Sequence, residues 1–161
     1  MVRVGILVMA RNKDEIMSNN EVHRLKIVKR YLENEGHEIV TSKMMKSNQE
    51  DLEEEMKEMS DINKLDLIIT IGGIGFREND VVPEATKNII HREANALIQG
   101  ISCFCLQISR KSILTRGVAG IRNKTLIVNF PEDTKLLIFI LDFALETILQ
   151  GINIIKSDKS F

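Results

Sequence analysis

Three glycines follow an apolar stretch and give the clearest chemical signal in the chain. The stretch 65–71 reads LDLIITI, and Gly72, Gly73 and Gly75 come directly after it in the segment Gly-Gly-Ile-Gly. Glycine permits positive φ angles and lets backbone N–H groups approach an anion closely. Ligands of open α/β sheets bind beyond the carboxyl ends of the strands. The pattern therefore predicts a phosphate-binding loop, and a tight strand-to-helix turn without a ligand is the alternative.

A carboxylate follows this loop at Asp80, five residues after Gly75. Mg²⁺ is typically held by one or two carboxylates together with phosphate oxygens, so Asp80 is a candidate magnesium ligand. A helix cap or turn is the alternative role for Asp80. Glu84 falls in the first turn of the next expected helix, where a carboxylate more often stabilises the helix dipole than takes part in catalysis. The spacing of the loop matches neither the Walker A motif nor the GxGxxG motif.

The stretch 101–124 contains five basic residues and no acidic one: Arg110, Lys111, Arg116, Arg122 and Lys124. Such a stretch can pair with phosphates. Solvated surface and a charged hairpin tip are the alternative, and they suffice for Arg122 and Lys124. Asn129 and Pro131 stand at the end of the last expected strand. Asn129 is therefore placed where a ligand-facing side chain would be.

The histidines and cysteines give no metal signal. His23, His37 and His91 have no metal-ligand spacing among them, and each reads as a surface or partly buried histidine. Cys103 and Cys105 lack a second cysteine pair, so a zinc site is not expected. Two cysteines also cannot form a disulfide framework, which favours a reducing, cytoplasmic location.

The elements that must position these residues alternate between strands and helices. Strands are expected at 2–9, 37–42, 65–71, 112–121 and 124–130, with a hairpin turn near Arg122-Asn123. A loop is expected at 10–20. Helices are expected at 21–35 and at 83–99, and a further helical stretch is expected at 101–108. Another helix is expected to begin after a cap at Asn48 or Ser47, and the last helix is expected to begin at Pro131. This order predicts an α/β fold with a mostly parallel sheet.

Length and composition limit the class of protein. The 161 residues favour a single domain over 1–161, and 43% hydrophobic residues suffice for a core. A net charge of −1 and an aromatic content of 4% without tryptophan argue against a nucleic-acid binder. The apolar segment 136–149 is shorter than the roughly 20 residues of a membrane span, and it reads as an amphipathic core helix. No signal-peptide cleavage site follows the apolar N-terminal run.

Two segments are similar to a known family. The segment 70–86 reads TIGGIGFRENDVVPEAT and resembles the TGGTG loop and DVTPEAT-like segment of the MogA/MoaB family of molybdenum-cofactor biosynthesis, which includes the gephyrin G domain. The segment 112–131 reads SILTRGVAGIRNKTLIVNFP and is similar to the family's A-x-LSR-x-x-x-GIRG-x-x-LI-x-NLPGSPK stretch. The motifs occur in the same order and at the same distance. The resemblance covers most of the chain and is strongest over 65–135.

The resemblance implies a three-layer α/β/α molybdopterin-binding fold, a homotrimer or hexamer, and adenylylation of molybdopterin by Mg-ATP with release of pyrophosphate. By matching position it implies that the glycines cradle phosphate and that Asp80 is catalytic and acts through Mg²⁺. It also implies binding roles for residues at the matching helix entry, at the LSR arginine and at the NLP-x-x-x-K end. These residues are Glu84, Thr86, Arg116, Asn129, Pro131 and Lys135.

The chain departs from the family motifs at several positions. The two threonines of the TGGTG loop are replaced by Ile71 and Ile74, and the threonine of the DVT segment is replaced by Val82. Isoleucine and valine have no hydroxyl to donate to a phosphate. Carboxylates of the family are lost at Lys46-Ser47 and within the segment 9–11. The Gly-Ser pair of the last motif is replaced by Glu132-Asp133, which could supply replacement metal ligands. Loss of one preorganised donor can cost about 10²–10³ in rate.

These departures leave three hypotheses for the function. The first is a molybdopterin adenylyltransferase. The second is a catalytically impaired member of the same fold that binds molybdopterin or a nucleotide, or that serves in assembly. The third is a CinA-type domain related to nucleotide pyrophosphatases.

Overall fold

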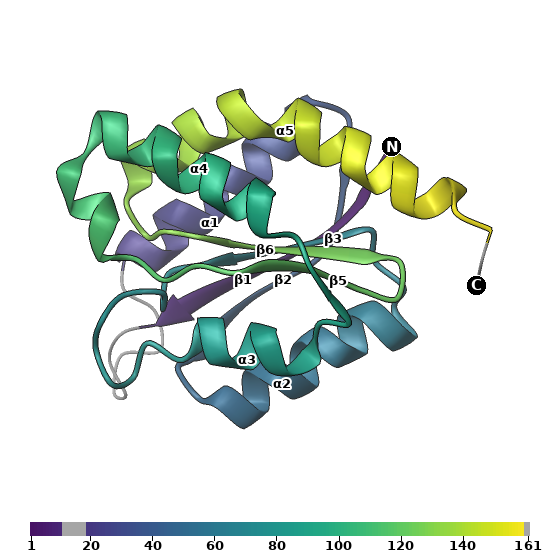
Figure 1. The fold of residues 1–161 in the computed structure, drawn as a ribbon, viewed down its shortest axis with the longest axis horizontal. Helices are drawn as coiled ribbons and strands as arrows, with labels where there is room; N and C mark the ends of the chain where they lie inside the picture. Colours follow the sequence, from purple (N-terminus) through teal and green to yellow (C-terminus); the bar gives the residue numbers. More distant parts are fainter. Residues whose placement is uncertain (11–18, 160–161) are drawn as a thin grey trace.

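One six-stranded sheet organises the part of the chain that the computed structural model describes, residues 1–10 and 19–159. The strand order is β2-β1-β3-β6-β5-β4 (Figure 1). β1 pairs in parallel with β2 and β3, and β3 pairs in parallel with β6. β5 runs antiparallel to both β6 and β4, so the sheet is mixed and mostly parallel, as predicted. The bounds are β1 Arg3–Ala10, β2 Glu38–Lys46, β3 Leu67–Ile71, β4 Arg92–Glu93, β5 Ala119–Arg122 and β6 Thr125–Phe130.

Helices cover both faces of this sheet and make the predicted three-layer α/β/α fold (Figure 1). One layer holds α1 (Asn19–Asn34), α4 (Asn95–Ile108) and α5 (Thr134–Ser157). The opposite layer holds α2 (Gln49–Lys57), the π-helical turn η1 (Glu58–Ile62) and α3 (Val82–Ile89). Each layer has its own apolar core against the sheet.

The central strands are apolar on both faces because both faces are covered. In β1, Ile6 and Val8 belong to the core under α1 and α5, whereas Leu7 and Met9 belong to the core under α2 and α3. β3 is buried along its whole length. Continuous β-branched runs are typical of parallel strands that lie between two helical layers. This arrangement brings the carboxyl ends of β3 and β6 together at one edge of the sheet.

The prediction of a single helix over 83–99 is wrong, because two helices with a short strand between them occupy this region. α3 ends at Ile89, a short strand β4 follows, and α4 starts at Asn95 and continues through the stretch predicted as a separate helical segment. The apolar periodicity continues across the break between α3 and α4. The backbone N–H groups at the break, however, donate hydrogen bonds to carbonyl groups of β5. His91 N donates to Ile121 O at 2.8 Å, and Ala94 N donates to Ala119 O at 2.8 Å. Hydrogen bonds to β5 therefore decide where the helix is interrupted.

The strand predicted at 112–121 is shorter than expected. A 3₁₀ turn, η2 (Arg110–Leu114), occupies its first part, and β5 starts only at Ala119. The predicted hairpin is present, since β5 and β6 pair with Arg122 opposite Thr125. Asn123 in the turn has a φ of 50°, a conformation that asparagine tolerates.

The last helix starts at Thr134 and not at Pro131 as predicted. Asp133 is its N-cap, because its side chain accepts hydrogen bonds from the backbone N–H groups of Lys135 and Leu136. The predicted cap Asn48 is confirmed for α2, where its side chain accepts from Asp51 N at 3.0 Å. A carboxylate or amide cap satisfies donors that the first helical turn leaves unpaired.

α5 is a core helix. Its 24 residues are long and apolar enough to cross a membrane by length and composition. However, one stripe of its side chains, which includes Leu137, Ile140 and Ile148, is buried against the sheet. The expectation of an amphipathic core helix is confirmed. Most of the predicted loop 10–20 lies outside the described residues; Ala10 belongs to β1, and Asn19 and Asn20 belong to α1.

Candidate functional site

The glycine loop follows β3 and adopts a backbone that favours glycine. Gly72 has a φ of 88° and Gly73 a φ of 70°. A Cβ atom on Gly73 would stand 2.6 Å from Val82 Cγ2, which no packed side chain tolerates. The loop is tied to the sheet because Gly72 N donates to Phe130 O at 3.0 Å. Gly72 and Gly73 thus adopt the positive φ angles that glycine permits, and phosphate binding by this loop stays a prediction.

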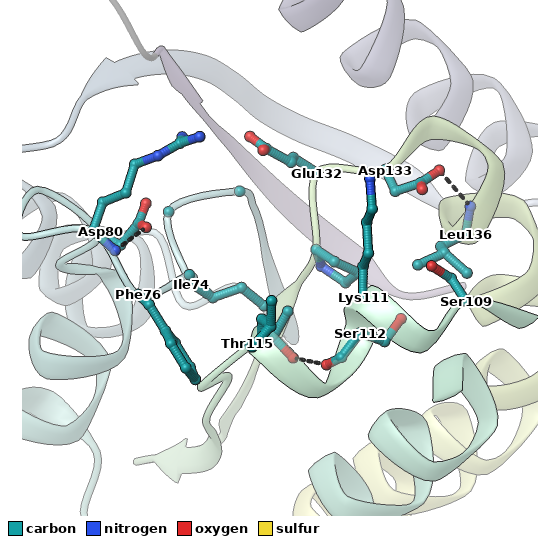
Figure 2. Close-up of a pocket in the computed structure, with 16 residues that line it drawn as sticks. Ile74, Phe76, Asp80, Ser109, Lys111, Ser112, Thr115, Glu132, Asp133 and Leu136 are labelled. Atoms are coloured by element: carbon teal, nitrogen blue, oxygen red, sulfur yellow. Dashed lines mark hydrogen bonds between the residues drawn. The ribbon is translucent and has the colours of Figure 1, made fainter. Parts of the chain in front are cut away.

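A cavity of about 530 Å³ opens over this loop, within the range of ligand cavities (Figure 2). It lies at the carboxyl ends of β3 and β6, where ligands of open α/β sheets bind. Segments far apart in the sequence line it: the loop 72–77 with Asp80, the η2 region, and the start of α5. The lining residues are Gly72, Gly73, Ile74, Gly75, Phe76, Arg77, Asp80, Ser109, Lys111, Ser112, Leu114, Thr115, Pro131, Glu132, Asp133 and Leu136.

Charged groups of both signs surround the cavity. Asp80, Glu132 and Asp133 supply carboxylates, and Arg77 and Lys111 supply cations. Figure 2 shows Asp80 on one side of the cavity and Lys111 and Asp133 on the other. The Asp80 carboxylate accepts a hydrogen bond from Arg77 N at 3.0 Å, which fixes its orientation. The cavity therefore offers two cations for phosphates together with a carboxylate held in a fixed orientation.

Arg116 holds the loop and does not line the cavity. Its Nε donates to Gly75 O at 2.8 Å, and its Nη2 donates to Asp80 O at 2.7 Å. Its Nη1 pairs with Glu84 Oε1 at 2.5 Å. The guanidinium lowers the pKa of Glu84, because a hydrogen bond from a cation favours the ionised carboxylate. The predicted phosphate-binding role of Arg116 has no support in this geometry; its donors reach the loop itself.

Glu84 lies beside the loop, outside the cavity lining. Its Oε1 is paired with Arg116, and its Oε2 is buried and has no partner among the described residues. Glu84 is therefore the anionic half of the Arg116 contact, located in the first turn of α3 as the sequence indicated.

Asn129 does not face a ligand as the sequence predicted. Its side chain is 1% exposed and donates to the hydroxyls of Thr70 at 2.9 Å and Thr86 at 3.1 Å. Its Oδ1 accepts from Val118 N at 2.9 Å. Thr86 in turn donates to Val82 O at 2.8 Å. Because a buried polar group needs partners, these side chains join β3, β6 and α3 behind the loop.

The structure brings together half of the predicted site residues. The predicted residues that line the cavity are Gly72, Gly73, Gly75, Asp80 and Pro131. Lys135 is exposed on the first turn of α5, outside the lining. Sequence reasoning missed Arg77, Ser109 and Thr115, for which no local pattern was available. Lys111 could be found from the sequence, since it belongs to the basic stretch 101–124 that was expected to pair with phosphates.

The departures from the family motifs differ in their relevance to the cavity. Ile71 is wholly buried in the core and does not line the cavity, so a hydroxyl there would not reach a ligand. Ile74 does line it. Asp133 caps α5 through its Oδ1, and Glu132 lines the cavity beside Gly72. Ser47 and Ala10, where the family carboxylates are lost, are not among the lining residues, and Ala10 is the buried last residue of β1.

The carboxylates fit one mode of magnesium binding. No group of three or more His, Cys, Asp and Glu residues able to hold a metal occurs within 1–10 and 19–159. An all-protein metal cage is therefore absent from the described part of the chain. Mg²⁺ bound mainly through phosphate oxygens needs only one or two carboxylates, and Asp80 and Glu132 line the same cavity.

Comparison with known proteins identifies the family. The model of a family described as "Probable molybdopterin binding domain" matches residues 14–150. The chain belongs to this family. It is 36% identical over 84 residues to the molybdopterin adenylyltransferase of Helicobacter pylori strain J99, covering 52% of this chain and 48% of that protein. It is 36% identical over 94 residues to gephyrin of Dictyostelium discoideum, covering 58% of this chain and 13% of that protein.

Solved structures of the family share the fold over nearly the whole chain. The Mog protein of Mycobacterium ulcerans has a TM-score of 0.85 at 25% identity, covering 98% of this chain and 99% of that chain. The MoaB protein of Thermus thermophilus has a TM-score of 0.82 at 25% identity and covers 98% of both chains. In sequence, by contrast, the chain matches about half the length or less of the curated relatives named above.

Proposed function

We propose that this member of the molybdopterin-binding family adenylylates molybdopterin with Mg-ATP and releases pyrophosphate. The observation that carries the proposal is the left-handed backbone at Gly72 and Gly73, which opens into a cavity that also contains Asp80. Relatives named molybdopterin adenylyltransferase support it. In this reaction a phosphate oxygen of molybdopterin attacks the α-phosphorus of ATP. The bond between the α-phosphorus and the bridging oxygen breaks, and pyrophosphate leaves.

Each group of the cavity has a role in this mechanism. Backbone N–H groups of the glycine loop bind phosphate oxygens, and Arg77 and Lys111 pair with their charge. Asp80 and Glu132 would hold Mg²⁺, which neutralises charge on the phosphates when bound. The protein contributes mainly by holding the two substrates in a reactive orientation. Arg116 fixes the loop that carries Asp80.

The proposal includes the assembly and the location. We expect a homotrimer or hexamer, and we place the reaction in the cytoplasm. Cys103 and Cys105 are both free thiols, as suits a reducing compartment.

A binding or assembly role without turnover is the second candidate. Two observations favour it: Ile74 lines the cavity without a hydroxyl, and Glu132 adds a negative charge beside the loop. Like charges repel, so Glu132 disfavours a phosphate in the absence of a cation. For the CinA-type alternative, a CinA protein of Thermoplasma acidophilum has a TM-score of 0.63 at 12% identity, which shows a shared fold only.

The test is molybdopterin-dependent release of pyrophosphate from Mg-ATP. Wild type is compared with Asp80→Asn, which keeps an oxygen for the Arg77 N–H, and with Glu78→Gln, an exposed neighbour outside the cavity lining. We expect a loss of about 10²-fold or more in Asp80→Asn, because the carboxylate that would hold Mg²⁺ against the phosphates is removed. Glu78→Gln should react like wild type. No release by wild type, with molybdopterin still bound, would establish the binding role instead.

A further inference from the structure

Two exposed apolar side chains line the cavity of the candidate site. Phe76 follows the glycine loop and is 66% exposed, and Leu114 at the end of η2 is 52% exposed. Ile74 and Leu136 line the same cavity but belong to the buried cores. A single exposed apolar residue is ordinary on a protein surface. Two on the wall of one cavity indicate an apolar contact for a ligand.

The backbone on both sides of Phe76 is held in place. Before it, Gly75 O accepts a hydrogen bond from Arg116 Nε at 2.8 Å. After it, Arg77 N donates to the Asp80 carboxylate at 3.0 Å, and Asp80 N donates to Arg77 O at 3.0 Å. The phenyl ring is therefore presented from a fixed backbone. Ordering such a side chain against a ligand restricts only two torsion angles, so the entropic cost of binding is small.

The segment that carries Leu114 is tied to the same loop. Arg116 N donates to Ile74 O at 2.7 Å, which holds the residues after η2 against the residues after the glycines. Thr115, between them, donates from its hydroxyl to Ser112 O at 2.8 Å. Leu114 and Phe76 thus line the cavity from two segments that hydrogen bonds hold together.

The apolar part of the cavity is separate from its acidic part. Figure 2 shows the Phe76 ring on the opposite side of the cavity from Glu132 and Asp133. Gly73 lies only three residues before Phe76. A ligand with its phosphates at the glycine loop can therefore place an attached group against the phenyl ring. The cavity volume of about 530 Å³ has room for both parts.

A flat ring is the group that an exposed phenyl side chain binds best. Aromatic rings prefer offset-stacked or edge-to-face contacts, which stabilise a pair beyond the area that it buries. Nucleic-acid bases stack on aromatic side chains whatever their hydrogen-bonding groups, because every base has a π-face.

We propose that Phe76 determines specificity by stacking on a planar heteroaromatic ring of the phosphate-bearing substrate, with Leu114 as a second apolar contact. The inference rests on the proposed function, in which both substrates carry such a ring: the adenine of ATP and the pterin of molybdopterin. The experiment distinguishes these two sources.

The test compares ligands that carry a ring with ligands that carry phosphate alone, by isothermal titration calorimetry in the presence of Mg²⁺. ATP is paired with inorganic tripolyphosphate, and neopterin monophosphate is paired with inorganic phosphate. We expect Phe76→Ala to weaken binding of one ring-bearing ligand by about tenfold, within the range for a base stacked on an aromatic side chain. Binding of tripolyphosphate should stay as in wild type. The ligand that loses affinity identifies the ring.

Two further substitutions separate stacking from a general apolar contact. Phe76→Tyr keeps the ring and should bind like wild type, whereas Phe76→Leu keeps an apolar side chain without a ring and should lose affinity. Ile62→Ala changes an apolar side chain that is 73% exposed and outside the cavity lining, and it should also bind like wild type. All these variants should melt near the wild-type temperature, because substitutions of largely exposed side chains change stability little.

Three results would overturn the inference. Full binding of both ring-bearing ligands by Phe76→Ala would show that the ring makes no contact. Equal losses for ATP and tripolyphosphate would make Phe76 a support of the glycine loop. A change in the mass of the assembly without a loss of ring binding would make it a contact between copies of the chain.

Failure of the proposed function gives a different result. If wild type binds neither ATP nor tripolyphosphate, the proposed reaction and the inference fail together. If wild type binds both and Phe76→Ala binds all four ligands equally well, the inference alone fails.

Discussion

Arg116 and Asn129 act from behind the cavity. Arg116 bonds to the carbonyl groups of Gly75 and Asp80, and Asn129 bonds to Thr70 and Thr86. Neither side chain lines the cavity, so their influence on a ligand passes through the position of the glycine loop. Their effect on the reaction is therefore indirect. A substitution can distinguish positioning of the loop from direct contact with a phosphate.

Arg116→Lys tests whether this residue positions the loop. Lysine keeps the positive charge but loses the planar fork that reaches three acceptors at once. We expect pyrophosphate release to fall by about tenfold, or roughly 1.4 kcal/mol of transition-state stabilisation. The free energy of unfolding should change by less than about 1 kcal/mol, because the pair with Glu84 is partly exposed.

The matched control is Arg30→Lys on the exposed face of α1. A phosphate contact made by charge alone would survive in Arg116→Lys. Full activity of that variant would therefore contradict the positioning role.

At the scale of elements, the start of α5 affects the candidate site most directly. Glu132 and Pro131 line the cavity just before the helix, and Asp133 caps its first turn. The same short segment thus ends β6, lines the cavity and starts the longest helix of the described chain. The position of Glu132 beside Gly72 follows from where the helix begins.

Asp133→Ala should lower the free energy of unfolding by about 1 kcal/mol, within the roughly 0.5–2 kcal/mol measured for lost caps. Asp133 accepts from Lys135 N at 2.9 Å and from Leu136 N at 3.4 Å, and alanine leaves both donors without this partner. Asp133→Ser keeps a capping oxygen and should retain most of the stability. Urea unfolding measures both variants. Equal losses in the two would show that the cap is not the cause.

The ion pair between Asp61 of η1 and Arg122 of the β5–β6 hairpin is expected to depend on pH. The hydrogen bond from Arg122 holds the pKa of Asp61 below its ordinary value of 3.8. A carboxyl with a lowered folded-state pKa stabilises the fold above its ordinary pKa and loses that contribution as the pH falls. Asp61→Asn should therefore be less stable than wild type at neutral pH, and the difference should shrink below pH 3.8.

Urea unfolding of the wild type and Asp61→Asn across this pH range provides the measurement. Glu33→Gln, an exposed change on α1, is the control. A difference between wild type and Asp61→Asn that is constant with pH would contradict the assignment.

At the scale of the whole molecule, exposed apolar side chains gather on α4 and α5. Phe104 on α4 stacks on Phe143 of α5, with ring centroids 4.2 Å apart. Phe143 is 50% exposed, and Phe139 and Leu106 are also exposed. Soluble monomers rarely expose large contiguous apolar patches, so this surface is the natural candidate for contact between copies of the chain.

Phe143→Lys should dissociate the expected homotrimer or hexamer. A lysine in an apolar interface carries a charge that must lose its water, which disfavours association. Ile62→Lys makes the same apolar-to-charged change at an exposed residue of η1, in the opposite helical layer, and should leave the assembly intact. Sedimentation equilibrium gives the mass of each variant. A monomeric wild type, or dissociation by both variants, would contradict the proposed surface.

The sequence alone predicted the α/β class with its mostly parallel sheet and the glycine loop that follows β3. Runs of β-branched residues identified β1, β3 and β6, and Gly72–Gly75 with Asp80 identified the loop that opens into the cavity. These are local signals: a strand buried on both faces must be apolar along its length, and a left-handed turn favours glycine.

Only the tertiary structure decided which polar side chains face the cavity. Arg116 reaches Gly75 across 41 residues of sequence, and Asn129 reaches Thr70 across 59. The break between α3 and α4 likewise depends on hydrogen bonds to β5, which comes later in the chain. No local pattern encodes these partners, because a buried donor is satisfied by whichever acceptor the folded chain brings within reach.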